Sequence, residues 1–159
     1  MMMSDDKSAA VAREKLIEYL NLKKMRKTSE RYAILDVVFS HNDHFKIETI
    51  YEEMEASSYH VSRSTVYNAI ELFCECGIVR KHQFRSRQSL YEKVASSGNH
   101  HHLICSECGK IKEVKDNELM KHISMHKYGS FTTSYFSLYV YGTCSACMKK
   151  MKRKNNKSK

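Results

Sequence analysis

Two Cys-x-x-Cys pairs constrain the fold of this chain more than any other feature. Cys105 and Cys108 form the first pair, and Cys144 and Cys147 form the second. Four thiolates complete the tetrahedral shell of Zn²⁺ and leave no open position for a substrate. The segment between the pairs is longer than the roughly 15–20 residues of a usual zinc ribbon. We therefore expect a structural zinc site that clamps a small αβ unit together.

Redox-active pairs or disulfides are the alternative explanation of these cysteines. Asp5 and Asp6 near the N-terminus are not followed by an apolar stretch, and no run approaches the length of a membrane helix. We therefore expect a soluble protein in the cytoplasm, where thiols stay reduced. Gly109 directly after Cys108 also favours zinc, because a metal knuckle needs a residue that tolerates positive φ.

The charge of the chain is unevenly distributed. The formal net charge is +9, and the segment from Met148 to Lys159 holds seven basic residues and no acidic one. We expect residues 149–159 to form a disordered tail, which either solubilises the protein or serves as an auxiliary nucleic-acid arm. Basic residues also cluster around Arg26 and around the pair Arg85 and Arg87, with a group of glutamates between them. This segregation predicts one basic and one acidic face.

The first part of the chain has the element order of a winged helix-turn-helix. Apolar periodicity predicts helices near residues 8–24, 29–39, 47–55 and 63–77, and two β-prone runs follow at 78–84 and 89–94. In such a domain the last helix enters the major groove and the basic hairpin lies along the phosphates. Polar residues at the start of the last helix favour this interpretation over an ordinary helical bundle with a solvated charged face.

The second part reads as a small αβ domain around the cysteines. After a hinge at residues 95–99 we expect strands at 100–104 and 110–115, a helix at 117–127 and a strand at 133–142. The predicted fold class is α+β, with a winged-helix domain at 1–94 and a zinc-containing domain at 100–148. Cys74 and Cys76 are interpreted as packing residues, because a Cys-x-Cys pair on a helix points in divergent directions.

Histidines before the first knuckle predict a second metal site. On a strand, His100 and His102 face one way and His101 faces the other. Ligands of this kind suit Fe²⁺, Zn²⁺ or Mn²⁺ and exchange more readily than a four-thiolate cage. A surface histidine cluster without a ligand role is the alternative. The candidate ligands, which come from an early turn, the hairpin and the strands near the knuckle, are His44, Glu92, His100, His102 and Glu113.

Several of these segments resemble one known family. The matching runs are Arg63-Ser64-Thr65-Val66-Tyr67, Leu90-Tyr91-Glu92, the stretch from His100 to Gly109, and Leu138-Tyr139-Val140-Tyr141-Gly142 before the last cysteine pair. They are similar to the ferric uptake regulator family of bacterial metal-responsive repressors. The resemblance implies a C-terminal domain that dimerises, a homodimer on a palindromic DNA operator, structural zinc at the four cysteines, and Fe²⁺ or another divalent metal at the His/Glu site.

The resemblance also implies roles in DNA binding. Tyr67 stands where the family contacts bases, and Arg26 stands where a basic residue reaches the minor groove. Asn68 replaces the arginine that commonly follows the tyrosine, which predicts a different operator preference. The full predicted DNA-binding set is Arg26, Arg63, Ser64, Thr65, Tyr67, Asn68, Arg85 and Arg87.

The predicted function is a metal-responsive transcriptional repressor and not an enzyme. A zinc deaminase, for example, needs a Pro-Cys-x-x-Cys motif, and the chain contains no proline. A peroxide-, zinc- or haem-responsive member of the same family stays open as an alternative, as does a zinc-ribbon protein that binds DNA without sensing metal. A peroxide sensor would be expected to carry an aspartate in place of Glu92.

Overall fold

A computed structural model of the chain describes residues 3–42, 44–57, 59–83, 89–94, 100–133 and 136–157. It divides into two compact units, Met1–Gly98 and Asn99–Lys159. The expected hinge at residues 95–99 and the predicted DNA contacts Arg85 and Arg87 lie outside the described residues. In the parts of the chain that the structure describes, no helix has the length and apolar character needed to cross a membrane.

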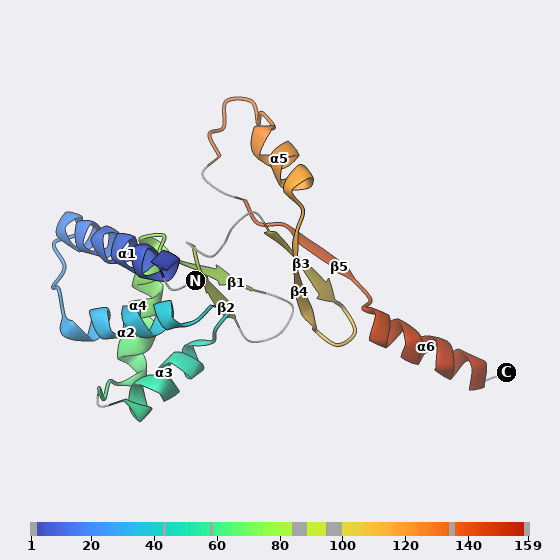
Figure 1. The fold of residues 1–159 in the computed structure, drawn as a ribbon, viewed down its shortest axis with the longest axis horizontal. Helices are drawn as coiled ribbons and strands as arrows, with labels where there is room; N and C mark the ends of the chain where they lie inside the picture. The colour runs from blue at the N-terminus through green and yellow to red at the C-terminus, as the bar shows by residue number, and fades with distance from the viewer. Residues whose placement is uncertain are drawn as a thin grey trace. The chain divides into compact units, whose positions relative to one another are not determined.

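The N-terminal unit contains four helices followed by a two-stranded hairpin (Figure 1). The strands pair antiparallel, and Arg80 lies opposite Glu92. Phe45 forms a β-bridge with Tyr91, so the segment before the third helix lies along the other edge of the hairpin. The elements are α1 (Met3–Leu22), α2 (Ser29–Ser40), α3 (Ile47–Ala56), α4 (Arg63–Glu75), β1 (Val79–His82) and β2 (Leu90–Lys93).

One apolar core holds these helices together. Each helix contributes side chains that are almost fully buried, among them Leu20 of α1, Ile34 of α2, Ile50 of α3 and Phe73 of α4. Burial of one such side chain stabilises a fold by about 1.5–3 kcal/mol. The apolar positions that predicted the helices are therefore the positions that pack in this core. Because the apolar side of α4 is buried there, its polar side faces solvent.

Both ends of α4 are defined by local chemistry. The hydroxyl of Ser62 accepts a hydrogen bond from the backbone N–H of Thr65 at 3.1 Å and so caps the start of the helix. Gly77 follows the helix with a φ of 68°, a conformation that glycine adopts without a steric penalty. The helix therefore begins and ends where the sequence predicts, within two residues.

The C-terminal unit is built on a three-stranded sheet in the order β4-β3-β5. The central strand β3 (His100–Cys105) pairs antiparallel with β4 (Ile111–Lys115) and parallel with β5 (Tyr139–Gly142). Helix α5 (Asn117–Met125) lies between β4 and β5 in the chain. The side chain of Asp116 caps its start, since Oδ1 accepts a hydrogen bond from the N–H of Leu119 at 2.9 Å. Helix α6 (Ser145–Lys157) follows β5 directly (Figure 1).

The structure corrects two predictions in this unit. Among the described residues of the strand expected at 133–142, only Tyr139–Gly142 form a strand, because those residues pair with β3. Residues 149–157 of the segment expected to be a disordered tail are part of α6. Its methionines, lysines and arginine are good helix formers, and its first turn is anchored, since the N–H of Met148 donates to the carbonyl of Cys144 at 2.9 Å.

Candidate metal centres and nucleic-acid interface

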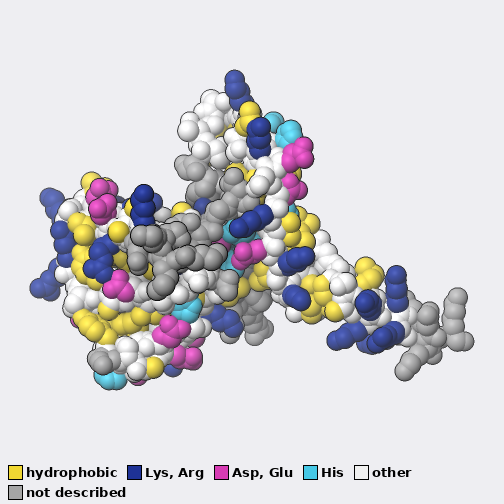
Figure 2. All heavy atoms as spheres, in the orientation of Figure 1, with side chains coloured by type: hydrophobic (Ala, Val, Ile, Leu, Met, Phe, Trp, Pro, Cys, Tyr) yellow, Lys and Arg dark blue, Asp and Glu magenta, His cyan; other side chains and the backbone are white. Residues whose placement is uncertain are grey.

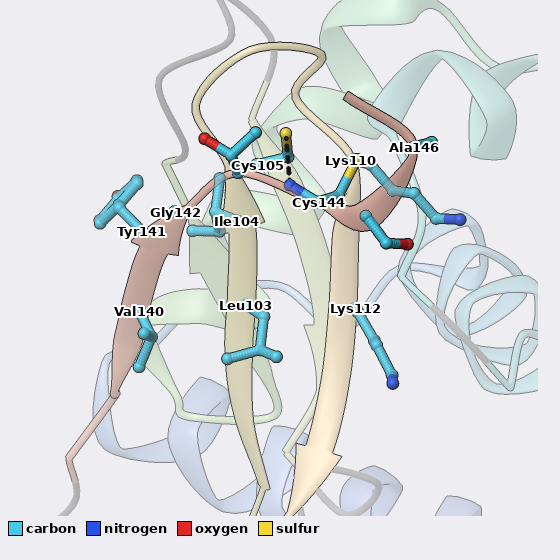
Figure 3. Close-up of a pocket in the computed structure, with 12 residues that line it drawn as sticks. Leu103, Ile104, Cys105, Lys110, Lys112, Val140, Tyr141, Gly142, Cys144 and Ala146 are labelled. Carbon is cyan, nitrogen blue, oxygen red and sulfur yellow. Dashed lines mark hydrogen bonds between the residues drawn. The ribbon is translucent and has the colours of Figure 1, made fainter. Parts of the chain in front are cut away.

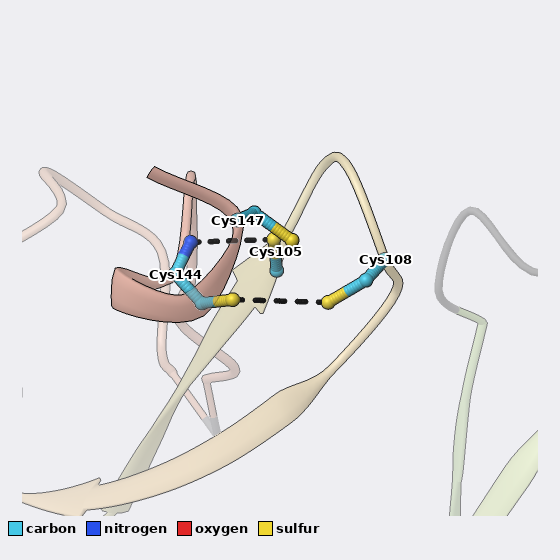
Figure 4. A group of neighbouring side chains, drawn as sticks. All are labelled: Cys105, Cys108, Cys144 and Cys147. Atoms are coloured by element: carbon cyan, nitrogen blue, oxygen red, sulfur yellow. Dashed lines mark hydrogen bonds between the residues drawn. The ribbon is translucent and has the colours of Figure 1, made fainter. Parts of the chain in front are cut away.

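The four cysteines of the two Cys-x-x-Cys pairs meet at one place in the C-terminal unit. Their sulfur atoms all lie within 4.8 Å of one another, and Figure 4 shows them facing a common centre. Cys108 and Cys144, which come from different knuckles, have sulfurs 3.8 Å apart. The first knuckle is a tight turn in which Gly109 has a φ of 72° and its N–H donates to the carbonyl of Cys105 at 2.9 Å. None of these thiols is in a disulfide.

The environment of the cluster suits thiolates bound to a cation. The backbone N–H of Cys144 donates to the sulfur of Cys105 at 3.3 Å. This donor, together with the N–H of Cys108, lowers the pKa of the Cys105 thiol to about 6. The neighbouring thiols of Cys144 and Cys108 in turn raise the pKa of Cys147. Four crowded thiols therefore cannot all ionise without a cation between them, and a closed set of four sulfurs fits Zn²⁺.

A second cluster lies in the N-terminal unit and contains two of the predicted regulatory ligands. His44 precedes the bridge residue Phe45 and lies beside Glu92 of β2, with Nε2 of His44 3.4 Å from Oε2 of the carboxylate. The side chain of Glu92 is only 6% exposed. The structure adds a third side chain that was not predicted, because Nε2 of His82 on β1 lies 2.7 Å from Oε1 of Glu92.

A third cluster lies in the C-terminal unit and contains the remaining predicted ligands. His100 and His102 are on the same face of β3, with ring centroids 4.8 Å apart. Glu113 on β4 lies opposite His102 in the sheet register. One donor atom from each of the three residues lies within 4.8 Å of the others. The middle histidine, His101, is buried and is not part of the cluster, as the alternation of a strand requires.

The exposed face of α4 carries the residues predicted to read DNA. Arg63, Ser64 and Asn68 are exposed, Thr65 is half-buried, and the ring of Tyr67 is 42% exposed. The hydroxyl of Tyr67 donates to Oε1 of Glu48 on α3 at 2.6 Å. This hydrogen bond raises the pKa of Tyr67 and lowers the pKa of Glu48.

Two arginines of the predicted DNA-binding set, Arg63 at the start of α4 and Arg26 before α2, have defined environments. The guanidinium of Arg63 lies 4.5 Å from the centre of the Tyr51 ring, a distance at which a cation–π interaction holds an exposed arginine in place. Arg26 is exposed in the segment between α1 and α2, and its carbonyl accepts a hydrogen bond from Arg31. Both cationic groups therefore remain available at the surface.

A pocket of about 570 Å³ lies beside the cysteine cluster on the sheet of the C-terminal unit. Figure 3 shows Leu103 of β3, Val140 of β5 and Lys112 of β4 among the side chains that line it. No carboxylate or histidine is among the lining residues, and the polar side chains that line the pocket are those of Cys105, Lys110, Lys112, Tyr141, Thr143, Cys144 and Ser145. Leu103, Ile104 and Val140 form its apolar part, which is typical of a contact surface.

Comparison with known proteins finds one family whose model matches most of the chain. The model of the ferric uptake regulator family matches residues 22–141. The chain is 34% identical over 134 residues to the ferric uptake regulation protein of Haemophilus influenzae, a match that covers 79% of this chain and 90% of that protein. It is 32% identical over 144 residues to the peroxide operon regulator of Bacillus subtilis, covering 89% of this chain and 97% of that protein.

A solved structure shares the fold. The ferric uptake regulator of Pseudomonas aeruginosa with manganese superimposes with a TM-score of 0.68 at 26% identity, over 79% of this chain and 95% of that chain. The match includes both units of the present structure, since it extends over more than either unit alone.

Proposed function

The chain belongs to the ferric uptake regulator family of metal-responsive regulators, and we propose that it represses transcription by binding a palindromic operator as a homodimer when a divalent metal is bound. The observation that carries the proposal is the pair of ligand clusters, one in each unit. His44 and Glu92 belong to the N-terminal unit, and His100, His102 and Glu113 belong to the C-terminal unit. One ion that takes ligands from both clusters would join the DNA-binding unit to the dimerisation unit.

Metal binding would act by selecting one arrangement of the two units. Without the ion the two DNA-binding units of a dimer sample many orientations, and few of them match two half-sites of an operator. A ligand shifts such an equilibrium only through its different affinity for the two arrangements. An ion that needs donors from both units has this property, because only one arrangement completes its coordination shell.

The regulatory ion is proposed to be Fe²⁺ or another divalent metal, and the structural ion Zn²⁺. Imidazole and carboxylate donors suit Fe²⁺, Mn²⁺ and Zn²⁺ alike, and the similar structure from Pseudomonas aeruginosa holds manganese. One relative is a ferric regulator and another a peroxide regulator. Glu92 favours metal sensing over peroxide sensing in this chain, because an aspartate is expected at that position in a peroxide sensor.

The DNA contacts are proposed to come from α4, the hairpin and the segment before α2. Tyr67 and Asn68 on the exposed face of α4 would contact base edges, and Arg26 would reach the minor groove. The remaining predicted contacts would bind phosphates or hold the helix in register; they are Arg63, Ser64, Thr65, Arg85 and Arg87. With double-stranded DNA as its partner and a closed thiolate site in place of an open one, the protein would work as a cytoplasmic regulator and not as an enzyme.

The small core of the C-terminal unit is an argument for the proposed dimer. Its buried apolar side chains among the described residues are few, namely Ile104, Cys105 and Met120. Val140 and Tyr141 on the edge strand β5 are 44% and 47% exposed. So small a core rarely stabilises a domain without a metal or a partner. A second copy that covers this sheet would supply the missing apolar contacts.

The double variant His100→Ala, His102→Ala tests the proposal. We expect it to retain one tightly bound zinc per chain and an intact dimer, because the four cysteines are unchanged. Its operator affinity should no longer depend on added Fe²⁺ or Mn²⁺, because the C-terminal unit can no longer ligate the ion. Fluorescence anisotropy on operator DNA, titrated against each metal under anaerobic conditions, measures this dependence.

The matched control is His122→Ala, which removes an exposed histidine of α5 in the same unit outside the cluster. This variant should respond to metal like the parent. If the double variant also responds like the parent, the His/Glu clusters are not the sensing site and the proposed mechanism is wrong.

A further inference from the structure

The hairpin brings His82 to the predicted regulatory site. In the β1–β2 pair Arg80 lies opposite Glu92, and His82 lies opposite Leu90. Since side chains alternate along a strand, His82 shares the face of Arg80 and lies diagonally across from Glu92. The bridge between Phe45 and Tyr91 places His44 beside Glu92 on the other edge of β2. His44 and His82 therefore approach one carboxylate from two sides.

The distances between these side chains are close to those of a ligand set. Nε2 of His82 lies 2.7 Å from Oε1 of Glu92, and Nε2 of His44 lies 3.4 Å from Oε2. The two imidazole rings meet edge to face with centroids 5.4 Å apart. Neighbouring donors around an ion with bonds of about 2.0–2.2 Å are themselves roughly 3–3.5 Å apart. Only small rotations of the rings would bring all three donors onto one ion.

The burial of His82 also points to a bound ion. Its side chain is 1% exposed, and that of Glu92 is 6% exposed. Arg80 approaches the same carboxylate, with Nη1 3.8 Å from Oε1, so Glu92 already has a cationic neighbour without His82. The ring nitrogen of this buried imidazole lies beside two other side chains of the kinds that bind metals. A role as a metal ligand explains this position better than a role as a second positive charge beside Glu92.

We propose that His82 is a ligand of the regulatory metal, so that the N-terminal unit supplies three donors, His44, His82 and Glu92. This inference rests on the proposed function, because it concerns the same ion. It also gives the order in which the ligands bind the ion. The three donors of the N-terminal unit hold the ion first, and His100, His102 or Glu113 then complete the shell. Binding of metal and response to metal are therefore separable in this protein.

Co²⁺ titration of the full-length dimer, with its zinc retained in the four-cysteine site, tests the inference. His100→Ala, His102→Ala should still bind one Co²⁺ per chain beyond the zinc, with reduced affinity. Adding His82→Ala to it should abolish this binding, and His82→Ala alone should weaken Co²⁺ binding by more than the roughly 10–100-fold that loss of a hydrogen-bonding neighbour of a ligand costs. Circular dichroism and gel filtration identify any variant that fails to fold.

Two further variants separate a ligand from a positioning residue. His82→Gln keeps a hydrogen-bond donor for Glu92 but is a poor ligand, and it should not restore binding. His82→Cys places a thiolate in the site and should give the Co²⁺ complex a sulfur-to-metal charge-transfer band that the parent lacks, at unchanged zinc content. If His82→Gln binds Co²⁺ like the parent, His82 is not a ligand.

Operator binding distinguishes this inference from the proposed function. If His82→Gln binds Co²⁺ and operator like the parent, and the parent responds to metal, the inference fails while the proposed function stands. If His82 is shown to ligate the ion but the parent binds operator equally well with and without metal, the proposed function fails while the ligand assignment stands.

Discussion

The hydroxyl of Tyr67 donates a hydrogen bond to Glu48, and the proposed contact of that hydroxyl with a base would have to replace this bond. The bond of 2.6 Å lowers the pKa of Glu48. A lowered pKa means that the interaction is fully present above the ordinary range of a glutamate and is lost only as the pH falls through the lowered value. At neutral pH the bond is therefore intact, and a base contact made by Tyr67 competes with it.

We expect Glu48→Gln to raise operator affinity. Gln leaves only a neutral acceptor for Tyr67, and since an exposed charge-assisted contact is worth about 0.5–1 kcal/mol, the weaker bond should strengthen operator binding by up to roughly two- to fivefold. Glu52→Gln removes the same charge from α3 without a contact to Tyr67 and serves as the control. Anisotropy titrations at fixed salt measure both.

A double-mutant cycle with Tyr67→Phe isolates the effect of the hydroxyl. In the Tyr67→Phe background Glu48→Gln should do no more than Glu52→Gln, because there is no bond left to release. Equal gains from Glu48→Gln in the two backgrounds would show that the carboxylate acts only through its charge.

Single residues differed in how far they could be predicted. The cysteine cluster was predictable because two short motifs supply all four ligands, and the structure brings them together as expected. His82 was not predicted, because it follows Arg80 and Lys81 in what reads as a basic strand. Its contact with Glu92 depends on the register of the hairpin, and the sequence of neither strand alone determines that register.

At the level of elements, α6 is the feature that the prediction missed. Its composition is that of a solvated tail, but its first turn is attached to the second cysteine knuckle. Figure 2 shows Lys and Arg side chains gathered along this helix. At about 100° per residue its basic positions fill one continuous arc, with Met148 and Met151 on the opposite side. Among the described side chains of the helix, the basic positions are Lys149, Lys150, Lys152, Arg153 and Lys154.

We expect this helix to add non-specific affinity for DNA. The triple change of Lys152, Arg153 and Lys154 to Gln should weaken binding to operator and to random DNA by similar factors. Each lost phosphate contact reduces the slope of log affinity against log salt by about 0.9. Binding measured at several salt concentrations gives this slope.

The control removes equal charge from the same unit. Lys115, Lys121 and Lys127, changed together to Gln, are exposed and lie outside both α6 and the pocket on the sheet. If this control lowers the slope as much as the α6 variant does, the effect comes from net charge and not from the helix. If neither changes the slope, α6 does not contact DNA.

The helices of the N-terminal unit were the most predictable elements and β5 the least. The helices follow from apolar periodicity, since each buries one stripe in a shared core. The bounds of β5 depend on its parallel partner β3, which lies more than thirty residues earlier in the chain. Such non-local pairing is not visible in the local sequence.

At the scale of the whole molecule, the two units should depend on zinc to different degrees. Cys105→Ser or Cys144→Ser should unfold the C-terminal unit, because structural zinc contributes on the order of 10–16 kcal/mol, against the about 5–15 kcal/mol that stabilises a whole domain. The N-terminal unit, with its own core, should remain folded. Zinc analysis measures the bound metal, gel filtration measures the dimer, and circular dichroism measures the helix content of the N-terminal unit.

The matched control is Cys74→Ser, which changes a half-buried thiol of α4 outside the metal cluster. It should keep its zinc and its dimer. A zinc-free Cys105→Ser protein that still elutes as a dimer would show that the cluster is dispensable for the fold.

The parallel pairing of β3 with β5 has a consequence for how the protein is made. The residues that complete the sheet and the second knuckle are synthesised more than thirty residues after β3, whereas the helices of the N-terminal unit depend mainly on near neighbours in the chain. Local contacts form fast, and closing a long loop waits for its second end. On the ribosome the helical unit should therefore be folded while the second half of the chain is still emerging. The proposed DNA-binding unit would then be complete before the chain can form its proposed dimer or its proposed regulatory metal site.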